Sequence, residues 1–232
     1  MKFTKNILEG QFIHRLNRFV AFVKLNEETV ITHVPNTGRC KEILLPGSKV
    51  LLREENGLGR KTKYDLIAGY KGEKLINIDS LIPNYVVAEA LLEGKIKELR
   101  AYNIIEREKT FIHSRFDFKL SKDNGEEYFL EIKGVTLEKD GVTMFPDAPT
   151  ERGKKHMLEL IDVRKSGRGA GVLFLIQLEG AKVFYPNDEM DKKFGEALRL
   201  AYYNGVDIYA YDCTLGRDYI TLKNKIYIKL FT

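Results

Sequence analysis

The sequence lacks any apolar run long enough to cross a membrane, and it is poor in cysteine. A membrane-spanning helix needs roughly 20 consecutive apolar residues, and no run approaches that length. Residues 1–10 (MKFTKNILEG) contain no apolar core of a secretory signal. The two cysteines, Cys40 and Cys213, have no CxxC partner, so reduced thiols are the simplest interpretation. These absences predict a cytoplasmic protein that does not use a membrane.

Internal repeats and low-complexity segments are also absent, so a globular fold is expected. A chain of 232 residues can bury a substantial core in one or two domains. Its composition, with 44% hydrophobic and 31% charged residues, is ordinary for such a protein. The net charge of +5 favours an anionic partner such as nucleic acid, but charge alone shifts the balance only slightly.

Residues 1–82 are predicted to form a first domain made mostly of strands. Apolar or β-branched runs are expected as strands over residues 12–25, 29–33, 49–53, 63–70 and 75–78. Between them lie turns rich in Gly, Pro and Asn, such as Pro46-Gly47 and Lys71-Gly72. About five short strands with Gly-rich turns predict a small closed β-barrel of the OB type.

This predicted barrel mixes cations with aromatic rings, a combination used to hold single strands of nucleic acid. The candidate nucleic-acid contacts are Arg15, Arg18, Arg39, Lys61 and Lys63. In the alternative interpretation, Phe19 and Phe22 belong to the core and the cations only face solvent. We favour the core for the two phenylalanines and leave the cations open.

Residues 83–232 are predicted to form a second domain that begins at Pro83-Asn84. Asn84 is expected to cap a helix from Tyr85 to about Leu99. Strands are then expected over 102–112, 114–120 and 128–135, a helix after Thr150 to about Ser166, strands over 170–177 and 181–185, a helix over 188–203, and strands over 206–212 and 219–230. This order predicts an α/β sheet with helices on its faces.

Two neighbouring strands of this domain carry charged residues in apolar surroundings. Glu131 and Lys133 are two positions apart and project from the same face of a strand. Burying their charges is costly unless they have a charged partner or a functional role. Antiparallel pairing can bring Asp117 beside them. Two carboxylates suit Mg²⁺ or Mn²⁺, and a lysine can assist phosphodiester hydrolysis. A cross-strand ion pair on a solvated face explains the pattern equally well.

Two helices offer further candidates, each with an alternative. Glu89 lies among the apolar positions of the first helix, so it is a candidate third acid or an ordinary surface residue. Arg152 and His156 share one face of the helix after Thr150, where they form a candidate phosphate contact or a solvated basic face.

The element order, with an acid on the second strand and Glu-x-Lys on the third, resembles the PD-(D/E)XK nuclease superfamily. The resemblance implies a restriction-endonuclease-like αβββαβ core with Asp117 and Glu131 as metal ligands and Lys133 as the catalytic lysine. Glu89 would match the acid often found on the first helix. Phe116 stands where this superfamily often has proline.

A closer resemblance, to the sugar fermentation stimulation protein family, covers nearly the whole chain. The matching stretches are residues 15–19 (RLNRF), 33–39 (HVPNTGR), 60–64 (RKTKY), 114–118 (SRFDF), 131–137 (EIKGVTL) and 145–156 (FPDAPTERGKKH). Cys40 and Pro149 depart from the expected pattern. The resemblance implies an N-terminal OB-like domain joined to a nuclease-like domain, and a DNA-binding protein linked to the regulation of sugar (maltose) metabolism.

We therefore expect a cytoplasmic nuclease or nuclease-like DNA-binding protein that uses Mg²⁺ or Mn²⁺. The ion would be held by Asp117, Glu131 and the carbonyl of Ile132, with Lys133 beside it. The expected phosphate contacts of this domain are Arg115, Arg152 and His156. Two alternatives stay open: a DNA-binding regulator that kept the fold without cleaving, and a phosphoesterase for a small sugar or nucleotide phosphate. The choice between DNA and RNA as the partner is also left open. So is the oligomeric state, for which a homodimer is one option.

Overall fold

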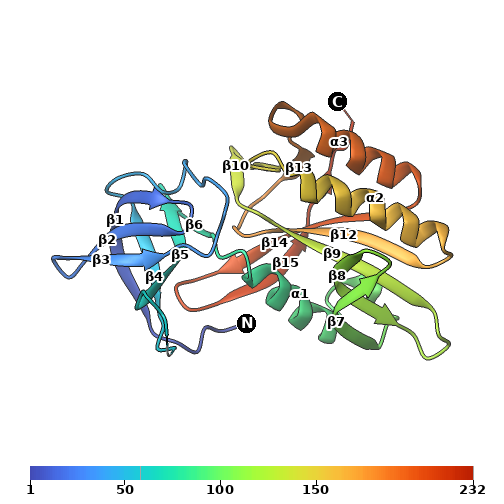
Figure 1. Ribbon diagram of the computed structural model, residues 1–232, viewed down its shortest axis with the longest axis horizontal. Coiled ribbons are helices and arrows are strands. Elements are labelled where there is room, and N and C mark those ends of the chain that lie inside the picture. The colour runs from blue at the N-terminus through green and yellow to red at the C-terminus, as the bar shows by residue number, and fades with distance from the viewer. Residues whose placement is uncertain (58, 232) are drawn as a thin grey trace.

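The computed structural model describes residues 1–57 and 59–231, and its N-terminal part is a β-barrel (Figure 1). The strands are β1 (Ile7–Asn17), β2 (Val20–Leu25), β3 (Glu28–His33), β4 (Lys49–Glu54), β5 (Tyr64–Lys71) and β6 (Lys74–Asn77). Their order is β3-β2-β1-β4-β5-β6, and β3 also pairs with β5, which closes the sheet. Apolar side chains that alternate along the strands, such as Ala21 and Val23 on β2, fill the interior. The closed barrel expected from the sequence is present.

The barrel differs from expectation at one turn, which gives it six strands. The single run predicted over residues 12–25 is a hairpin, because the chain reverses at Arg18 and Phe19 between β1 and β2. The backbone N–H of Phe19 donates to Oδ1 of Asn17 at 2.8 Å, so the asparagine side chain stabilises the reversal. The turn has none of the glycine that usually marks a tight hairpin, and the sequence pattern therefore hid it.

The second domain is a six-stranded sheet with helices on both faces (Figure 1). Its main elements are α1 (Ile82–Leu92), β7 (Ile104–Phe111), β8 (Ser114–Ser121), β9 (Glu127–Val135), α2 (Glu151–Lys165), β12 (Gly169–Ile176), α3 (Asp188–Tyr203), β14 (Asp207–Leu215) and β15 (Ile220–Lys225), with a 3-10 turn at Lys97–Leu99. The strand order is β15-β14-β12-β9-β8-β7, with the apolar strand β12 in the interior as expected. Helix α1 packs on one face, and α2 and α3 pack on the other.

A second, smaller sheet lies beside this domain and was not expected from the sequence. It contains β10 (Leu137–Lys139), β11 (Val142–Phe145), β13 (Val183–Pro186) and β16 (Tyr227–Ile228). The strand predicted over residues 219–230 is therefore divided into β15 and β16, which belong to different sheets. Such short strands depend on pairing between distant segments, and no local pattern specifies them.

The two residues that were predicted to cap helices, Thr150 and Asn84, behave differently. Thr150 caps α2 as expected, since its Oγ1 accepts a hydrogen bond from the backbone N–H of Gly153 at 3.0 Å. Helix α1 instead begins at Ile82, with Pro83 in its first turn, and Gly94 lies just beyond its end with φ +62°. Asn84 is thus inside the helix and does not cap it, which corrects the expectation from the sequence.

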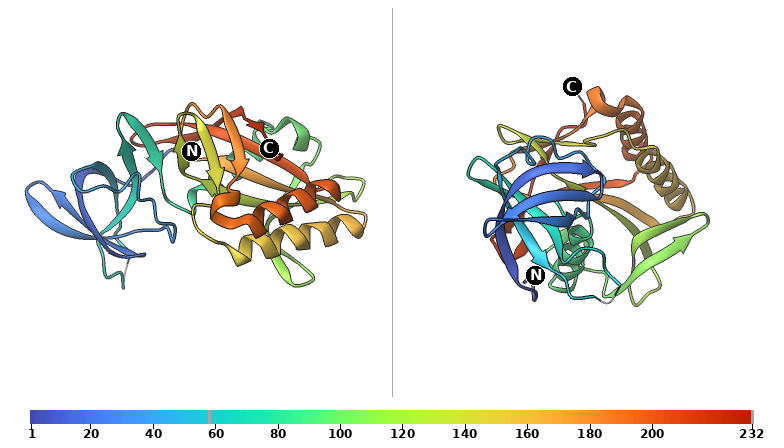
Figure 2. Two further views of the ribbon diagram at one scale, coloured as in Figure 1. Left: turned by 90° about the horizontal axis from the view of Figure 1, so that it is seen from above. Right: turned by 60° about the vertical axis from the view of Figure 1, so that its left-hand side comes forward.

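The two domains are joined by polar contacts and by one shared hydrophobic cluster. The side chain of Gln177 donates to Oδ1 of Asn77 at 2.7 Å and to the carbonyl of Asp79 at 3.1 Å. The N-terminal segment crosses to the second domain, where the N–H of Phe3 donates to the carbonyl of Asp218 at 2.8 Å (Figure 2). These contacts hold the barrel against the sheet. A boundary near residues 82–83 stays a prediction.

No helix within residues 1–57 and 59–231 combines the length and the apolar character needed to cross a membrane.

Candidate functional site

The strands β8 and β9 part at Asp117, and the carboxylate of this residue occupies the opening. Regular pairing ends at Phe118 and Leu130. Beyond that point Oδ2 of Asp117 accepts a hydrogen bond from the backbone N–H of Ile132 at 2.8 Å. Its other oxygen, Oδ1, accepts one from the side chain of Asn84 on α1 at 2.7 Å. Asp117 is therefore held from both the sheet and the helix.

Glu131, on β9, is only 3% exposed, and its two oxygens have different surroundings. Oε1 accepts hydrogen bonds from Nζ of Lys133 and from Nδ1 of His156, each at 2.5 Å. Oε2 is buried and has no hydrogen-bond partner among the described residues. One oxygen of this carboxylate is therefore saturated and the other is left for a further ligand.

Helix α2 sets the orientation of His156. The Nε of Arg152 donates to Nε2 of His156 at 3.4 Å, so the proton of the imidazole is on Nδ1, where it serves Glu131. The ring also lies edge-on to Phe116, with the ring centres 6.2 Å apart. The spacing of four residues that places Arg152 and His156 on one helix face thus aligns a chain of donors toward Glu131.

The two carboxylates have pKa values shifted in opposite directions. Burial is the main influence on Asp117 and, with the charge of Glu131, raises its pKa, against the opposing hydrogen bonds from Ile132 and Asn84. Burial also acts to raise the pKa of Glu131, but the hydrogen bond from His156 and the charge of Lys133 outweigh it and lower that pKa. Two coupled acids with divergent pKa values are typical of a functional site.

The donor set fits a small, hard cation. A buried carboxylate oxygen without a donor is costly, and a cation at Oε2 of Glu131 would remove that cost. Within the described ranges, no three His, Cys, Asp or Glu side chains are grouped to hold a metal. An ion here would therefore complete its shell with backbone oxygen and water, which Mg²⁺ commonly does beside one or two carboxylates.

Glu89, predicted as a third acid, does not lie with this cluster. Its Oε2 accepts a hydrogen bond at 2.5 Å from the amino group of Met1, which also donates to the carbonyl of Ile220 at 2.7 Å. Asn84 and Glu89 are five positions apart, so they point about 140° apart around α1. The helix presents Asn84 to Asp117 and Glu89 to the start of the chain.

Two predicted phosphate contacts are also occupied within the protein. His156 is 5% exposed and binds Glu131, so it positions a carboxylate instead of reaching a phosphate. Arg15 clamps loops of the barrel: its guanidinium donates to the backbone carbonyls of Asn17, Arg18, Asn36, Gly38 and Arg39. Both side chains stabilise local structure.

The other predicted cations lie at the surface. Arg18 stacks on the ring of Phe19, with Cζ 4.7 Å from the ring centre. Lys63 pairs with Glu54 at 3.1 Å, and Arg115 pairs with Glu108 at 3.5 Å. Further exposed cations are Arg39, Lys61 and Arg152. The core interpretation of Phe19 is wrong, because this side chain is 42% exposed.

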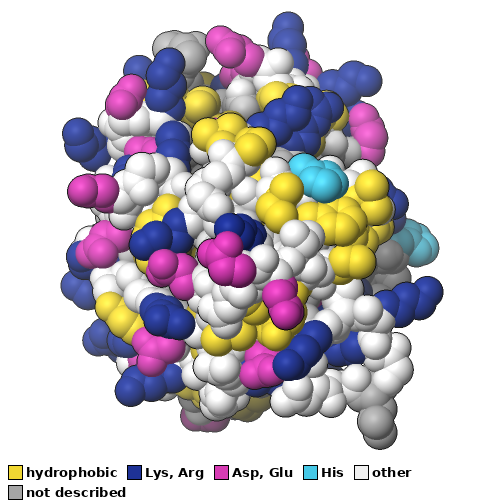
Figure 3. All heavy atoms as spheres, turned by 90° about the vertical axis from the view of Figure 1, so that its left-hand side faces the viewer, with side chains coloured by type: hydrophobic (Ala, Val, Ile, Leu, Met, Phe, Trp, Pro, Cys, Tyr) yellow, Lys and Arg dark blue, Asp and Glu magenta, His cyan; other side chains and the backbone are white. Residues whose placement is uncertain are grey.

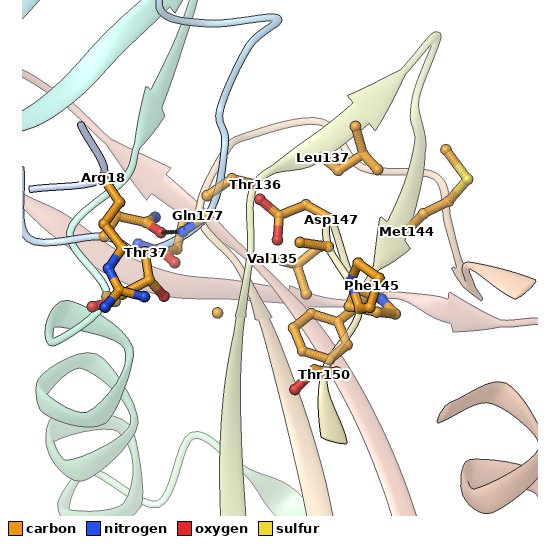
Figure 4. A pocket seen from close by; sticks show the side chains of 17 residues that line it. Arg18, Thr37, Val135, Thr136, Leu137, Met144, Phe145, Asp147, Thr150 and Gln177 are labelled. Carbon is orange, nitrogen blue, oxygen red and sulfur yellow. Dashed lines mark hydrogen bonds between the residues drawn. The ribbon is translucent and has the colours of Figure 1, made fainter. Parts of the chain in front are cut away.

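A cleft of about 380 Å³ opens between the two domains beside the cluster (Figure 4). Arg18 and Thr37 of the barrel lie on one side of it, and Asp147 and Thr150 lie on the other (Figure 4). Its lining on β9 begins at Gly134, the residue directly after Lys133. A ligand in this cleft would therefore contact β9 one residue beyond Lys133, while Asp117, Glu131 and Lys133 are not among the residues that line the cleft.

Comparison with known proteins confirms the two-part fold. A family model for the sugar fermentation stimulation protein RE domain matches residues 81–219, and one for the SfsA N-terminal OB domain matches residues 13–78. Sugar fermentation stimulation protein homologs from Clostridium botulinum and Clostridium kluyveri are 67% and 64% identical over 230 residues, which cover 99% of this chain and 100% of theirs. The structure of Pyrococcus furiosus SfsA in complex with Ca²⁺ matches with a TM-score of 0.90 at 28% identity over 99% of both chains. The chain belongs to the sugar fermentation stimulation protein family.

Proposed function

We propose that the chain is a DNA-binding phosphodiesterase that depends on Mg²⁺ or Mn²⁺. The observation that carries the proposal is the buried, unpartnered Oε2 of Glu131 in a cluster with Asp117 and Lys133. The Ca²⁺ in the Pyrococcus furiosus relative supports it, since Ca²⁺ also binds through oxygen ligands. The RE domain is consistent with phosphodiester chemistry, and the barrel with a nucleic-acid partner.

The protein's own residues would prepare the metal site. Asp117 and Glu131 would hold the ion, with the carbonyl of Ile132 as a third protein ligand. Asn84 and the N–H of Ile132 keep the carboxylate of Asp117 in place, and His156 turns Glu131 so that Oε2 is left for the ion. A bound Mg²⁺ or Mn²⁺ supplies polarisation of the phosphate and a lowered pKa for a bound water.

Lys133 would act on the phosphate itself. Its side chain is 15% exposed, and Nζ lies 2.5 Å from Oε1 of Glu131, at the end of β9 that borders the cleft. A fixed ammonium at this place can stabilise the charge that develops on a phosphate oxygen during hydrolysis. Arg115 and Arg152 are exposed and would contact neighbouring phosphates, although each also has a partner within the protein, Glu108 and His156 respectively.

The second candidate is a DNA-binding regulator that does not cleave. One observation favours it: Lys133 and Glu131 already neutralise each other, so the cluster is stable as an ion pair without a metal. In that case the barrel would carry the activity, and the link to sugar metabolism would arise through transcription.

Calorimetry with Mn²⁺ and then Mg²⁺ distinguishes the two candidates. The wild type should show one site, and the double variant Asp117→Asn/Glu131→Gln should lose it. Glu93→Gln is a matched control, because Glu93 is 47% exposed and, among the residues that the structure describes, forms an ion pair only with Lys95. A positive result leads to cleavage assays on DNA, on RNA and on a small phosphodiester. Absence of binding, with and without DNA, would contradict the nuclease and support the regulator.

A further inference from the structure

A groove on the barrel combines an apolar floor with cations and, among the described residues that line it, has no acidic side chain. It has a volume of about 560 Å³ and is lined by β1 and the loop that leads to β4. Three exposed cations, Arg18, Arg39 and Lys41, border it. We call this surface the barrel groove. Its charge is complementary to a polyanion, and a neutral or cationic peptide would lack that complementarity.

The barrel groove also presents a rigid ring at its surface. The exposed imidazole of His14 stacks on Phe22, with ring centres 4.7 Å apart and planes 23° apart. Leu45, on the facing loop, is 55% exposed. Figure 3, which faces the barrel, shows hydrophobic side chains gathered around a histidine with Lys and Arg side chains beside them. A supported ring next to cations is the arrangement on which unpaired bases stack.

The barrel groove is continuous with the cleft between the domains. Arg18, Thr37 and Gly38 line both of them. Gly38 also lies against the second domain, since a Cβ there would lie 2.4 Å from Oδ2 of Asp147. The cleft continues to Gly134, next to Lys133. The barrel groove and the cleft together therefore lead from β1 over Arg18 to Gly134, the residue that follows Lys133 on β9.

We propose that the barrel groove binds a single-stranded nucleic acid and that the strand continues through the cleft to the Asp117–Glu131 cluster. Bases would rest on His14 and Leu45, and phosphates on Arg18, Arg39 and Lys41. A duplex hides its base faces in the stack and presents mainly phosphates, so the apolar part of the barrel groove has a use only for unpaired bases. This inference rests on the proposed function for the site at the end of the path.

Binding without metal tests the barrel groove separately from any cleavage. Fluorescence anisotropy in EDTA would compare a labelled 20-nucleotide single strand with a hairpin duplex of the same length. We expect the single strand to bind at least about tenfold more tightly. Arg18→Ala and Arg39→Ala should each make the negative slope of log K against log salt concentration shallower by about 0.7, the value for one lost phosphate contact on a single strand. Lys24→Ala on the same barrel is the control, because Lys24 pairs with Glu27 and lies outside the barrel groove.

A base-stacking readout then separates the apolar contacts from charge. An oligonucleotide containing 2-aminopurine should change its fluorescence on binding to the wild type. His14→Ala should lose this change and weaken binding about 5- to 150-fold, the range for one stacked base. His14→Phe keeps a ring and should retain both signals. Circular dichroism of each variant checks that the barrel is folded.

Several results would overturn the inference. Equal affinity for duplex and single strand, or groove variants that bind like Lys24→Ala, would show that the barrel groove is not the binding surface. Self-association of the wild type that Leu45→Glu abolishes, with unchanged oligonucleotide binding, would make it an interface between copies. Single-strand binding through the barrel groove without cleavage would support this inference while refuting the nuclease. Cleavage that is unaffected by the groove variants would contradict this inference while still supporting the nuclease.

Discussion

His156 and Glu131 are joined by a hydrogen bond of 2.5 Å from Nδ1 to Oε1, although one lies on α2 and the other on β9. The bond saturates one oxygen of the carboxylate and leaves Oε2 buried without a partner among the described residues. Helix α2 thereby determines which oxygen is available to a cation. A residue that was predicted to contact phosphate instead positions the carboxylate that we propose as a metal ligand.

The first prediction concerns this positioning role. His156→Ala should weaken Mn²⁺ binding about 10- to 100-fold, as is usual when a hydrogen-bond partner of a metal ligand is removed. His156→Asn should restore most of the affinity, because its amide N–H can replace Nδ1–H as the donor. Calorimetry measures both variants. Equal loss in the two variants would indicate that His156 contributes only packing against Phe116.

The second prediction separates chemistry from metal binding at Lys133. Lys133→Ala should lower the rate of DNA cleavage by about 10²–10³, the usual effect of removing one group that stabilises transition-state charge. Mn²⁺ affinity should be retained, since His156 still holds Oε1 of Glu131. Single-turnover cleavage and calorimetry measure the two effects.

Lys155→Ala is the matched control for that measurement. Lys155 lies on α2, its side chain is 60% exposed, and its nearest acid is Glu159 at 3.6 Å. This variant should cleave at the wild-type rate. Full activity in Lys133→Ala would rule out the mechanism proposed for the lysine.

The sequence predicted the neighbourhood of Asp117, Glu131 and Lys133 because these residues lie on two adjacent strands. Side chains alternate between the two faces of a strand, so residues two apart, such as Glu131 and Lys133, share one face. The turn between the two strands makes antiparallel pairing the expected arrangement. The closed barrel and the buried β12 were predictable for similar local reasons. Each depends on patterns within about ten residues.

The partners that complete the site were not predictable in this way. Asn84 precedes an apolar run and was therefore interpreted as a helix cap, but the helix starts at Ile82, two residues before Asn84, and carries the side-chain amide of Asn84 to Asp117. Glu89 was selected for its apolar neighbours, whereas its partner is the amino group of Met1, 88 positions away. Contacts between distant segments decided both cases.

The third prediction concerns the cysteines. Burial raises the pKa of Cys40 to about 12, and burial likewise raises the pKa of Cys213. Since the thiolate is the reactive form, neither thiol should react with a disulfide reagent in the native protein at pH 8. Two thiols per chain should react after unfolding in guanidinium. Rapid reaction of one thiol in the native state would contradict the burial of that residue.

The last prediction is a pH dependence at the junction of the domains. Glu138 on β10 is 4% exposed, and its Oε1 accepts hydrogen bonds from Nζ of Lys74 and the N–H of Gly141, each at 2.7 Å. Burial acts to raise the pKa of Glu138, but the bonds from Lys74, Gly141 and Lys71 outweigh it and lower the pKa. The folded pKa thus lies below the unfolded value of about 4.3.

A lowered pKa means that the ionised carboxylate stabilises the fold. This contribution is present above about pH 4.3 and is lost as the pH falls through the folded pKa. Glu138→Gln should therefore reduce the free energy of unfolding by about 1.5–3 kcal/mol at pH 7, and the two proteins should converge once the pH has fallen below the folded pKa of Glu138. Urea denaturation at several pH values measures the difference, with Glu93→Gln as the exposed control. A difference that does not change with pH would show that the charge of Glu138 does not hold the domains together.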